Sequence, residues 1–366
     1  MSEPAAFDFQ VGADDLHATR FAPTPDPNEI DLRPGHILLA VDRFGFSANN
    51  ITYATLGTAM RYWDFFPAPE GWGRVPIWGF AEVVRSNVPE ISEGERIFGY
   101  LPMSTHVVMQ PDGITDHAFV DAAPHRAELP GVYQRYGRVS ADPNHDPTRE
   151  DQQALWQPLF MTSFGAADFL EANALFGGEA VVFSSASSKT ALGTAFLLTH
   201  DRKEGAPVIG LTSPANVEFC RQLGYYTEVL SYDDLGSLKR ETPTVFVDLA
   251  GNQRLLNDLK SLLEADLKHT VVVGATHWDQ RDAGGGLGGN DSTFFFLPSW
   301  MEKRRKEWGP GEFGKRYAAA RNAFFPSVDS WMKIVHSQGK EAVEAVYLET
   351  LDGKVSPEVG HILSFA

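Results

Sequence analysis

The chain has 366 residues, 43% of them hydrophobic, and a formal net charge of −17. This length suggests about two to three domains at ~150 residues each, and the apolar content argues against extensive disorder. The negative charge disfavours nucleic acid and anionic membranes as partners. One cysteine, Cys220, excludes an internal disulfide, and the absence of an apolar leader or a membrane-length apolar stretch predicts a soluble, cytoplasmic protein.

The first third of the chain is predicted to consist of short β-strands. Residues 1–30 are polar and contain Pro23, Pro25 and Pro27, so we expect them to wrap the surface rather than to form a core. A strand is expected at 36–47, and further strands follow to about residue 110, joined by turns such as PEISEGE. This pattern favours a β-rich, barrel-like domain.

Strands and helices alternate in the middle of the chain. A helix is expected over about 151–176, and four parallel strands with helices between them then span 181–276. This alternation predicts a doubly wound parallel sheet. Beyond it we expect, in order, a possible strand in TFFFLP (293–298), helices over about 299–308 and 312–323, one amphipathic helix in 328–366, and possible closing strands in YLETL and GHILSF.

The first strand–turn–helix unit of the predicted parallel sheet is VVFSSASSKTALG, at residues 181–193. In such a sheet the first turn directs backbone N–H groups and a helix N-terminus towards a phosphate. The turn has no glycine, and Ser185, Ser188 and Ala191 stand where a glycine-rich loop has its small residues. An anion site is therefore expected here.

The turn allows two other interpretations. Lys189 and Thr190 resemble the end of a P-loop, but Phe183 and Ser188 occupy both glycine positions of that motif, which disfavours a triphosphate site. An ordinary turn whose serines cap the following helix remains the simpler alternative.

Several strings resemble the medium-chain dehydrogenase/reductase superfamily, in its zinc-less quinone-oxidoreductase-like branch. ILLAVDRFGFSANNITYATLG resembles a barrel strand and turn of that family, with Asn49 and Thr52 in its Asn and Asp places. ISEGERIFGYLPMSTHVV resembles a further barrel strand, and VFVDLAGN and VVVGATHW resemble strands of the cofactor domain. VVFSSASSKTALG stands where the branch has its AxxGxxG loop, with the alanine and both glycines replaced.

The resemblance covers about residues 33–365 and implies two domains. These are a GroES-like catalytic barrel, expected over 1–150 and 300–366, and a Rossmann domain that binds NAD(P)H, expected over 151–299. The fold class is therefore α/β, with a doubly wound parallel sheet beside a β-barrel.

The end of the second strand bears on the choice of cofactor. An NAD-selective site usually places Asp or Glu there, whereas this chain has Thr212-Ser213-Pro214-Ala215-Asn216. We therefore expect NADP(H), with charge from Lys189 or Arg202, although the same polar residues could simply cap the next helix. His277 could likewise lie near the nicotinamide or merely pack against the glycine-rich loop. The expected cofactor contacts are Ser185, Ser187, Ser188, Lys189, Thr190, Thr212, Ser213, Asn216, Gly251, Gly274, Thr276 and His277.

An aromatic cluster, which includes Trp78, falls where the resembling branch builds its substrate cleft. A zinc-less reductase needs a group that protonates or polarises the developing enolate. Tyr53 or Tyr62 could donate, with Arg61 lowering the phenol pKa from its usual value of ~10. Taken singly, however, such an aromatic residue is more often barrel core or lid than catalyst. The expected catalytic set is Tyr53, Asn49, Thr52, Arg61 and Tyr62.

No metal site is expected, because Cys220 lies on a predicted helix and the histidines lack ligand spacing. The leading hypothesis is a metal-independent NADPH reductase of an enone, quinone or activated carbonyl compound. Alcohol or ketone redox chemistry, a lyase in the same cleft, and a non-catalytic NADP-binding scaffold or sensor stay open. The expected partners are a small-molecule substrate and a second copy of the chain, which pairs through TFFFLP at a sheet edge.

Overall fold

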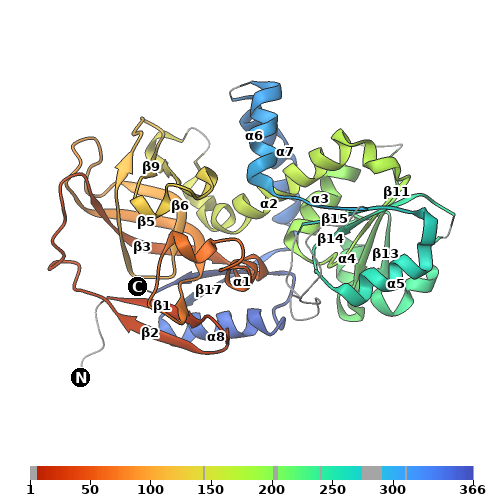
Figure 1. Cartoon of the computed structure of the whole chain (residues 1–366), viewed down its shortest axis with the longest axis horizontal. Coiled ribbons are helices and arrows are strands. Elements are labelled where there is room, and N and C mark those ends of the chain that lie inside the picture. Colours follow the sequence, from red (N-terminus) through yellow and green to blue (C-terminus); the bar gives the residue numbers. More distant parts are fainter. Residues whose placement is uncertain are drawn as a thin grey trace. The chain divides into compact units, whose positions relative to one another are not determined.

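The structure is a computed structural model that describes residues 6–142, 145–200, 205–239, 241–273, 291–309 and 311–365. The chain forms two compact units (Figure 1). Unit 1 comprises Met1–Gln157 and Lys333–Ala366, and unit 2 comprises Pro158–Met332. Within the described ranges, every helix is too short or too polar to span a bilayer.

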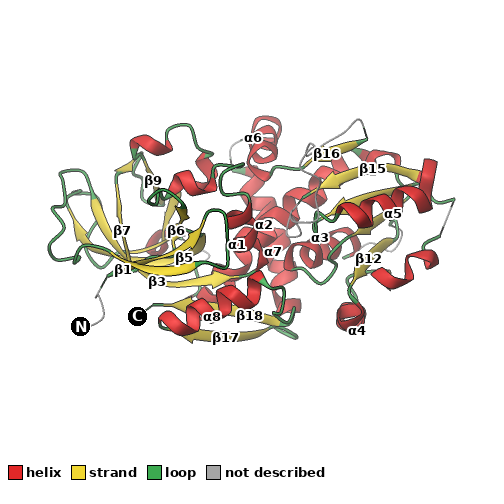
Figure 2. Cartoon of the chain, turned by 60° about the horizontal axis from the view of Figure 1, so that its bottom comes forward, coloured by secondary structure: helices red, strands yellow, loops and turns green. Residues whose placement is uncertain are grey.

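Unit 1 is built on a nine-stranded, barrel-like sheet (Figure 2). One edge of β3 (Ile37–Phe46) pairs with β7 near its start and with β18 near its end, while the other edge pairs with β5. The strand order is β17-β18-β3-β5-β6-β10-β9-β8, and only the β17–β18 ladder is parallel. The remaining bounds are β5 Pro76–Ser86, β6 Arg96–Pro102, β7 His106–Met109, β8 Pro111–Asp112, β9 Ala118–Asp121, β10 Arg135–Arg138, β17 Lys333–Gln338 and β18 Val359–Ser364.

The N-terminal segment enters the core of unit 1 at β1, so the prediction that residues 1–30 wrap the surface is wrong for residues 6–12, whereas nearly all of 13–30 is exposed or half-buried. Strand β1 (Phe7–Gly12) is buried at all six positions and forms a three-stranded sheet with β2 (Thr19–Pro23) and β4 (Trp72–Gly73). Its polar residue Asp8 is buried because Ser104 Oγ and Arg74 Nη2 donate to its carboxylate, at 2.6 and 2.5 Å. Paired partners from distant segments thus permit a buried strand without a continuous apolar run.

Two helices complete unit 1. Helix α1 (Ala48–Thr55) begins at the capping residue Ser47, and α8 (Lys340–Leu351) packs against β17 and β18. The string GHILSF includes most of β18, whereas YLETL lies within α8 rather than in a strand. The reason is the helical spacing of the buried residues Val343, Val346, Tyr347 and Thr350.

Unit 2 contains a six-stranded parallel sheet in the order β13-β12-β11-β14-β15-β16. Counted from β11, this is the order 3-2-1-4-5-6 of a doubly wound nucleotide-binding sheet, and the predicted fold class is confirmed. The strands are β11 Ala180–Phe183, β12 Val208–Thr212, β13 Glu228–Ser231, β14 Thr244–Asp248, β15 Leu267–Val272 and β16 Ser292–Phe294. The helices are α2 Glu150–Ala172, which begins in unit 1, α3 Lys189–Thr199, α4 Val217–Leu223, α5 Gln253–Leu263, α6 Leu297–Trp308 and α7 Glu312–Val328.

Helices α6 and α7 belong to unit 2, although residues 300–332 were expected to belong with the barrel. The aromatic packing explains the difference. Phe324 of α7 stacks on Phe160 of α2 with ring centroids 4.6 Å apart, and Phe313 lies 5.3 Å from Phe164.

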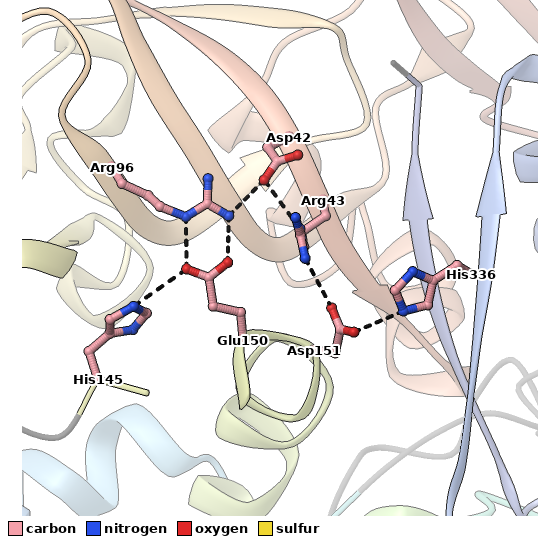
Figure 3. Close-up of polar contacts among 7 residues, drawn as sticks. All are labelled: Asp42, Arg43, Arg96, His145, Glu150, Asp151 and His336. Atoms are coloured by element: carbon pink, nitrogen blue, oxygen red, sulfur yellow. Dashed lines mark hydrogen bonds and ion pairs between the residues drawn. The ribbon is translucent and has the colours of Figure 1, made fainter. Parts of the chain in front are cut away.

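The first turn of α2 is held within unit 1 by charged side chains from three strands (Figure 3). Glu150 accepts hydrogen bonds from Arg96 Nε and Nη2, at 2.8 and 2.6 Å, and Arg96 also reaches Asp42. Asp151 Oδ2 lies 2.8 Å from His336 Nε2 of β17. The two carboxylates also lie at the positive end of the helix dipole, so this network fixes where α2 starts.

Candidate functional site

The turn after β11 is joined to the end of β14 by Ser184. Its hydroxyl is fully buried, donates to Asp248 Oδ1 at 2.9 Å, and accepts from Leu249 N at 2.8 Å and Ala250 N at 3.0 Å. Asp248 Oδ1 also accepts from Gly251 N at 2.8 Å. The loop after β14, including the predicted cofactor residue Gly251, is therefore wrapped around one buried carboxylate.

Ser185 adopts a left-handed backbone conformation, with φ of 49°. Glycine is the usual residue at such a position. The serine here therefore adopts the backbone conformation for which other loops of this kind use glycine. The Ser185 N–H donates to the hydroxyl of Tyr232, at 2.7 Å, and Tyr232 begins the short helix η8 (Tyr232–Ser237) after β13. Burial raises the pKa of Tyr232 to about 12, so its hydroxyl stays protonated and keeps its own hydrogen for another acceptor.

The turn lies directly against β12. Ala186 N donates to Leu211 O at 2.9 Å, and Tyr226 Oη donates to Ala186 O at 2.8 Å. Gly210 makes this approach possible, since a Cβ there would come within 2.8 Å of the Ala186 Cβ. The loop and the end of β12 consequently form one surface.

Three of the predicted cofactor residues meet at that end of β12. The Thr212 hydroxyl and the Asn216 Nδ2 both donate to Ser187 Oγ, at 3.3 and 3.1 Å. Ser213 and Asn216 precede η7 (Pro214–Asn216) and α4, and neither side chain makes a capping hydrogen bond. Ser213 and Asn216 therefore do not cap the following helices with their side chains, which was the alternative to a cofactor role. The segment 212–216 also contains no acid.

Helix α3 starts at this loop. Ser188 is its N-cap and accepts from Ala191 N at 3.3 Å, while Lys189 and Thr190 form its first turn. Desolvation lowers the pKa of Lys189 to about 8. A lysine at the positive end of a helix makes this the most anion-attracting part of the turn.

Three expected cofactor contacts, Gly274, Thr276 and His277, lie outside the described residues. So does Arg202, the alternative to Lys189 as a source of charge. Tyr232 and Asp248, in contrast, hold the turn through hydrogen bonds from other elements but were not singled out in the sequence. An acid at the end of a strand that neighbours β11 was the available signal for Asp248.

In unit 1, the predicted catalytic residues of α1 separate into two groups. Tyr53 is buried, and its hydroxyl accepts from Trp78 Nε1 at 3.2 Å. The Asn49 side chain acts on the same phenol and lowers its pKa, against the larger effect of burial. Thr52 instead donates to the Ala48 carbonyl of its own helix, at 3.3 Å. Asn49 therefore joins Tyr53, and Thr52 does not.

Arg61 does not act on the phenols as expected. It is exposed, adopts a left-handed conformation with φ of 60°, and pairs with Asp64, Nε to Oδ2, at 2.7 Å. Burial raises the pKa of both Tyr53 and Tyr62. The expectation that Arg61 lowers a phenol pKa is wrong, because the local ion pair satisfies the guanidinium and desolvation dominates the phenols.

Two further tyrosines complete what we call the tyrosine cluster: Tyr53, Tyr62, Tyr100 and Tyr133. The ring centroids of Tyr53 and Tyr62, and of Tyr100 and Tyr133, are 4.8 Å apart, and Tyr53 lies 5.4 Å from Tyr100. Among the described residues, the buried Tyr100 hydroxyl has no hydrogen-bond partner. Tyr133 belongs to η3 (Gly131–Tyr133), in a segment whose sequence gave no signal of function.

Within the described ranges, no three His, Cys, Asp or Glu side chains are placed to hold a metal ion. Cys220 is buried, and burial raises the pKa of its thiol to about 12.

The fold is shared with several known structures. CurA from Vibrio vulnificus in complex with NADPH matches with a TM-score of 0.60 and 13% identity, over 97% of this chain and 96% of that one. TarJ from S. aureus in complex with NADPH matches with a TM-score of 0.57 and 9% identity, over 99% of each chain. The yhdH oxidoreductase from Salmonella enterica in complex with NADP has a TM-score of 0.53 and 12% identity, over 98% of this chain and 100% of that one.

At these identities the likeness concerns the fold, a Rossmann-type unit together with a barrel-like unit. No curated protein matches the sequence. A family match in sequence spans residues 44–356 and so includes most of both units. The chain belongs to the family described as "Protein of unknown function (DUF2855)".

Proposed function

We propose that this protein is an NADPH-dependent, metal-independent oxidoreductase of the medium-chain dehydrogenase/reductase type. Its substrate on this proposal is an enone, a quinone or another activated carbonyl compound. One observation carries the proposal: Thr212 and Asn216 converge on Ser187 at the end of β12, beside the N-terminus of α3 and without a carboxylate.

These residues fit the phosphates of NADP(H). A carboxylate at the end of the second strand would bind a ribose 2′-hydroxyl and repel a 2′-phosphate. Here the corresponding groups are a serine hydroxyl, a threonine hydroxyl and an amide, and Lys189 supplies a cation. Three structural neighbours, CurA, TarJ and yhdH, were crystallised with NADPH or NADP, which supports the same assignment.

Tyr53 is the residue that we assign as proton donor. Because Trp78 Nε1 donates to its oxygen, its own hydrogen is directed elsewhere. When bound, the nicotinamide of NADPH supplies the hydride. Tyr53 then gives its proton to the enolate or alkoxide of the substrate, and the Trp78 N–H stabilises the phenolate left behind until solvent reprotonates it.

We also propose that the protein is a homodimer that pairs through β16. This strand is the last of the described sheet, and an open strand edge favours pairing with a second chain. Phe295 packs inside its own unit, 5.3 Å from Phe169, so its replacement would damage the fold. Phe294 is only half-buried. Phe294→Lys should therefore yield a folded monomer on sizing, whereas a wild-type chain that elutes as a monomer at micromolar concentration contradicts the proposal.

The activity is tested by following NADPH oxidation against an enone, a quinone and an aldehyde, after exhaustive chelation. Turnover that needs added zinc would contradict metal independence. Binding of NADPH without oxidation of any substrate would favour a scaffold or sensor, and reduction of NADP by alcohols would favour alcohol redox chemistry.

A pair of tyrosine variants tests the proton donor. Tyr53→Phe should lower kcat roughly 100-fold or more, the usual contribution of a general acid, with unchanged NADPH affinity. Tyr347→Phe is the matched control, because Tyr347 is buried in the same unit and its hydroxyl donates to Leu16 O outside the cluster. Equal kcat in the two variants would remove Tyr53 from the mechanism.

A further inference from the structure

Arg126 is a fully buried cation next to the tyrosine cluster. It ends the short helix η2 (Pro124–Arg126) and is 2% exposed. Its Nη1 lies 3.1 Å from Oδ2 of Asp121, which is also buried. Burying two such charges costs several kcal/mol per ion, and an apolar pair of similar volume is often as stable. Stability alone is therefore a weak explanation for this pair.

The guanidinium holds the segment that carries Tyr62. Arg126 Nε donates to the Phe65 carbonyl at 3.1 Å, and the guanidinium carbon lies 4.5 Å from the centre of the Phe66 ring. Phe65 is the last residue of η1 (Tyr62–Phe65). These contacts fix the end of the helical turn on which Tyr62 stands.

The same guanidinium holds the strand that carries Tyr100. Arg126 Nη1 donates to Tyr136 Oη at 2.9 Å, and Tyr136 Oη donates to the Tyr100 carbonyl at 2.7 Å. Burial raises the pKa of Tyr136 to about 12 despite the nearby cation, so the phenol is a neutral donor. Gly99 leaves space for this ring, since a Cβ there would lie 2.4 Å from Tyr136 Cδ1.

The backbone of Arg126 anchors the segment that carries Tyr133. Gln134 Nε2 donates to the carbonyl oxygens of Arg126 and Leu129, at 3.0 and 2.6 Å. Arg126 thus holds, directly or through Tyr136, the three chain segments that carry Tyr62, Tyr100 and Tyr133.

We propose that Arg126, held by Asp121, is a positioning residue: it sets the placement of Tyr62 and Tyr100, and through their rings the orientation of the Tyr53 hydroxyl. The role in catalysis rests on the proposed function. Misplacing a reacting group by about 1 Å can cost about 100-fold in rate, so the effect of losing this residue is measurable.

The test uses a double variant, Arg126→Met with Asp121→Leu, which removes both charges and leaves no unpaired ion. The matched control is Arg138→Met with Glu95→Leu. It removes another arginine–carboxylate pair of unit 1, which joins at 2.5 Å (Nε to Oε1) and has no contact with the tyrosine cluster. If the Arg126 double variant does not fold, Arg126→Lys replaces it, because a lysine keeps the charge but cannot make both the Phe65 and Tyr136 bonds.

The near-ultraviolet circular dichroism of the tyrosines, kcat, KM and the NADPH dissociation constant are measured for each folded variant. We expect the Arg126 variant to change the tyrosine signal and to lower kcat roughly 10- to 100-fold, with the NADPH constant unchanged. The control should change none of these. An unchanged tyrosine signal and an unchanged kcat would overturn the proposal. If the wild type itself lacks NADPH turnover, the proposed function fails, and the tyrosine signal alone still decides whether Arg126 positions the cluster.

Discussion

Replacing Ser184 with alanine removes the hydroxyl that joins the turn after β11 to the loop after β14. The Leu249 N–H loses an acceptor at 2.8 Å, whereas Ala250 N keeps a second acceptor in Asp248 Oδ1, at 3.1 Å. Asp248 Oδ1 loses the donor at 2.9 Å and keeps Ala250 N and Gly251 N. The substitution therefore strands one buried N–H and removes one charge-assisted bond.

These losses set the expected magnitude. A stranded buried donor costs about 1–3 kcal/mol, and a hydrogen bond to a charged group contributes about 1.5–3 kcal/mol. Alanine has no hydroxyl that must be kept away from water, and this gain offsets part of the two losses. We therefore expect the free energy of unfolding to fall by about 3 kcal/mol. That corresponds to a roughly 100-fold loss of protection from amide exchange.

The assay is hydrogen exchange of peptides covering residues 246–252, combined with urea unfolding. Ser261→Ala is the matched control, since Ser261 is exposed and its hydroxyl donates only to Asn257 O of its own helix, at 3.0 Å. Such a surface change should stay within about 0.5 kcal/mol. A Ser184→Ala protein with the same exchange and unfolding midpoint as the control would refute the assigned role of this hydroxyl.

Two predictions concern pH and one concerns packing. Because desolvation lowers the pKa of Lys189 to about 8, a phosphate bound beside it should restore the proton, so NADPH affinity should fall as pH rises above about 8. Calorimetry in two buffers of different ionisation enthalpy should detect proton uptake that is absent in Lys189→Gln. Because burial raises the pKa of Tyr53 and Tyr62, their contribution to stability is fully present below about pH 10 and is lost as pH rises further. Tyrosinate absorbance that rises well before alkaline unfolding would contradict this. Phe295→Ala should destabilise unit 2 by about 3–5 kcal/mol, and a cost below about 1 kcal/mol in urea unfolding would contradict its burial against Phe169.

The parallel sheet of unit 2 could be predicted from the sequence, because parallel strands are buried on both faces and have continuous apolar runs. Strand β1 could not, since Asp8 is paired with Arg74 and Ser104, which lie far away in the chain. The helix α8 was partly mistaken for a strand because YLETL is too short a window to distinguish the two periods.

In the candidate site, too, residues with a local sequence signal could be predicted, whereas contacts between distant segments could not. The neutral polar segment at Thr212 and Asn216 was visible in the sequence, because it follows its strand directly. Tyr232 reaches Ser185 only through the order of strands in the sheet, and Tyr100 reaches Tyr53 only through the barrel, so neither contact has a local signal. The pairing of Arg61 with Asp64 is local, at i and i+3, so the sequence could have indicated it.

Titration of the protein with NADPH and with NADH tests the central claim most directly. Asn216→Asp places a carboxylate at the end of β12, and Gln222→Glu adds the same charge at an exposed position of α4 as its control. The account predicts that the wild type binds NADPH at least tenfold more tightly than NADH, and that Asn216→Asp, but not Gln222→Glu, removes this preference. Equal affinity of the wild type for the two cofactors, or no binding of either, would contradict it.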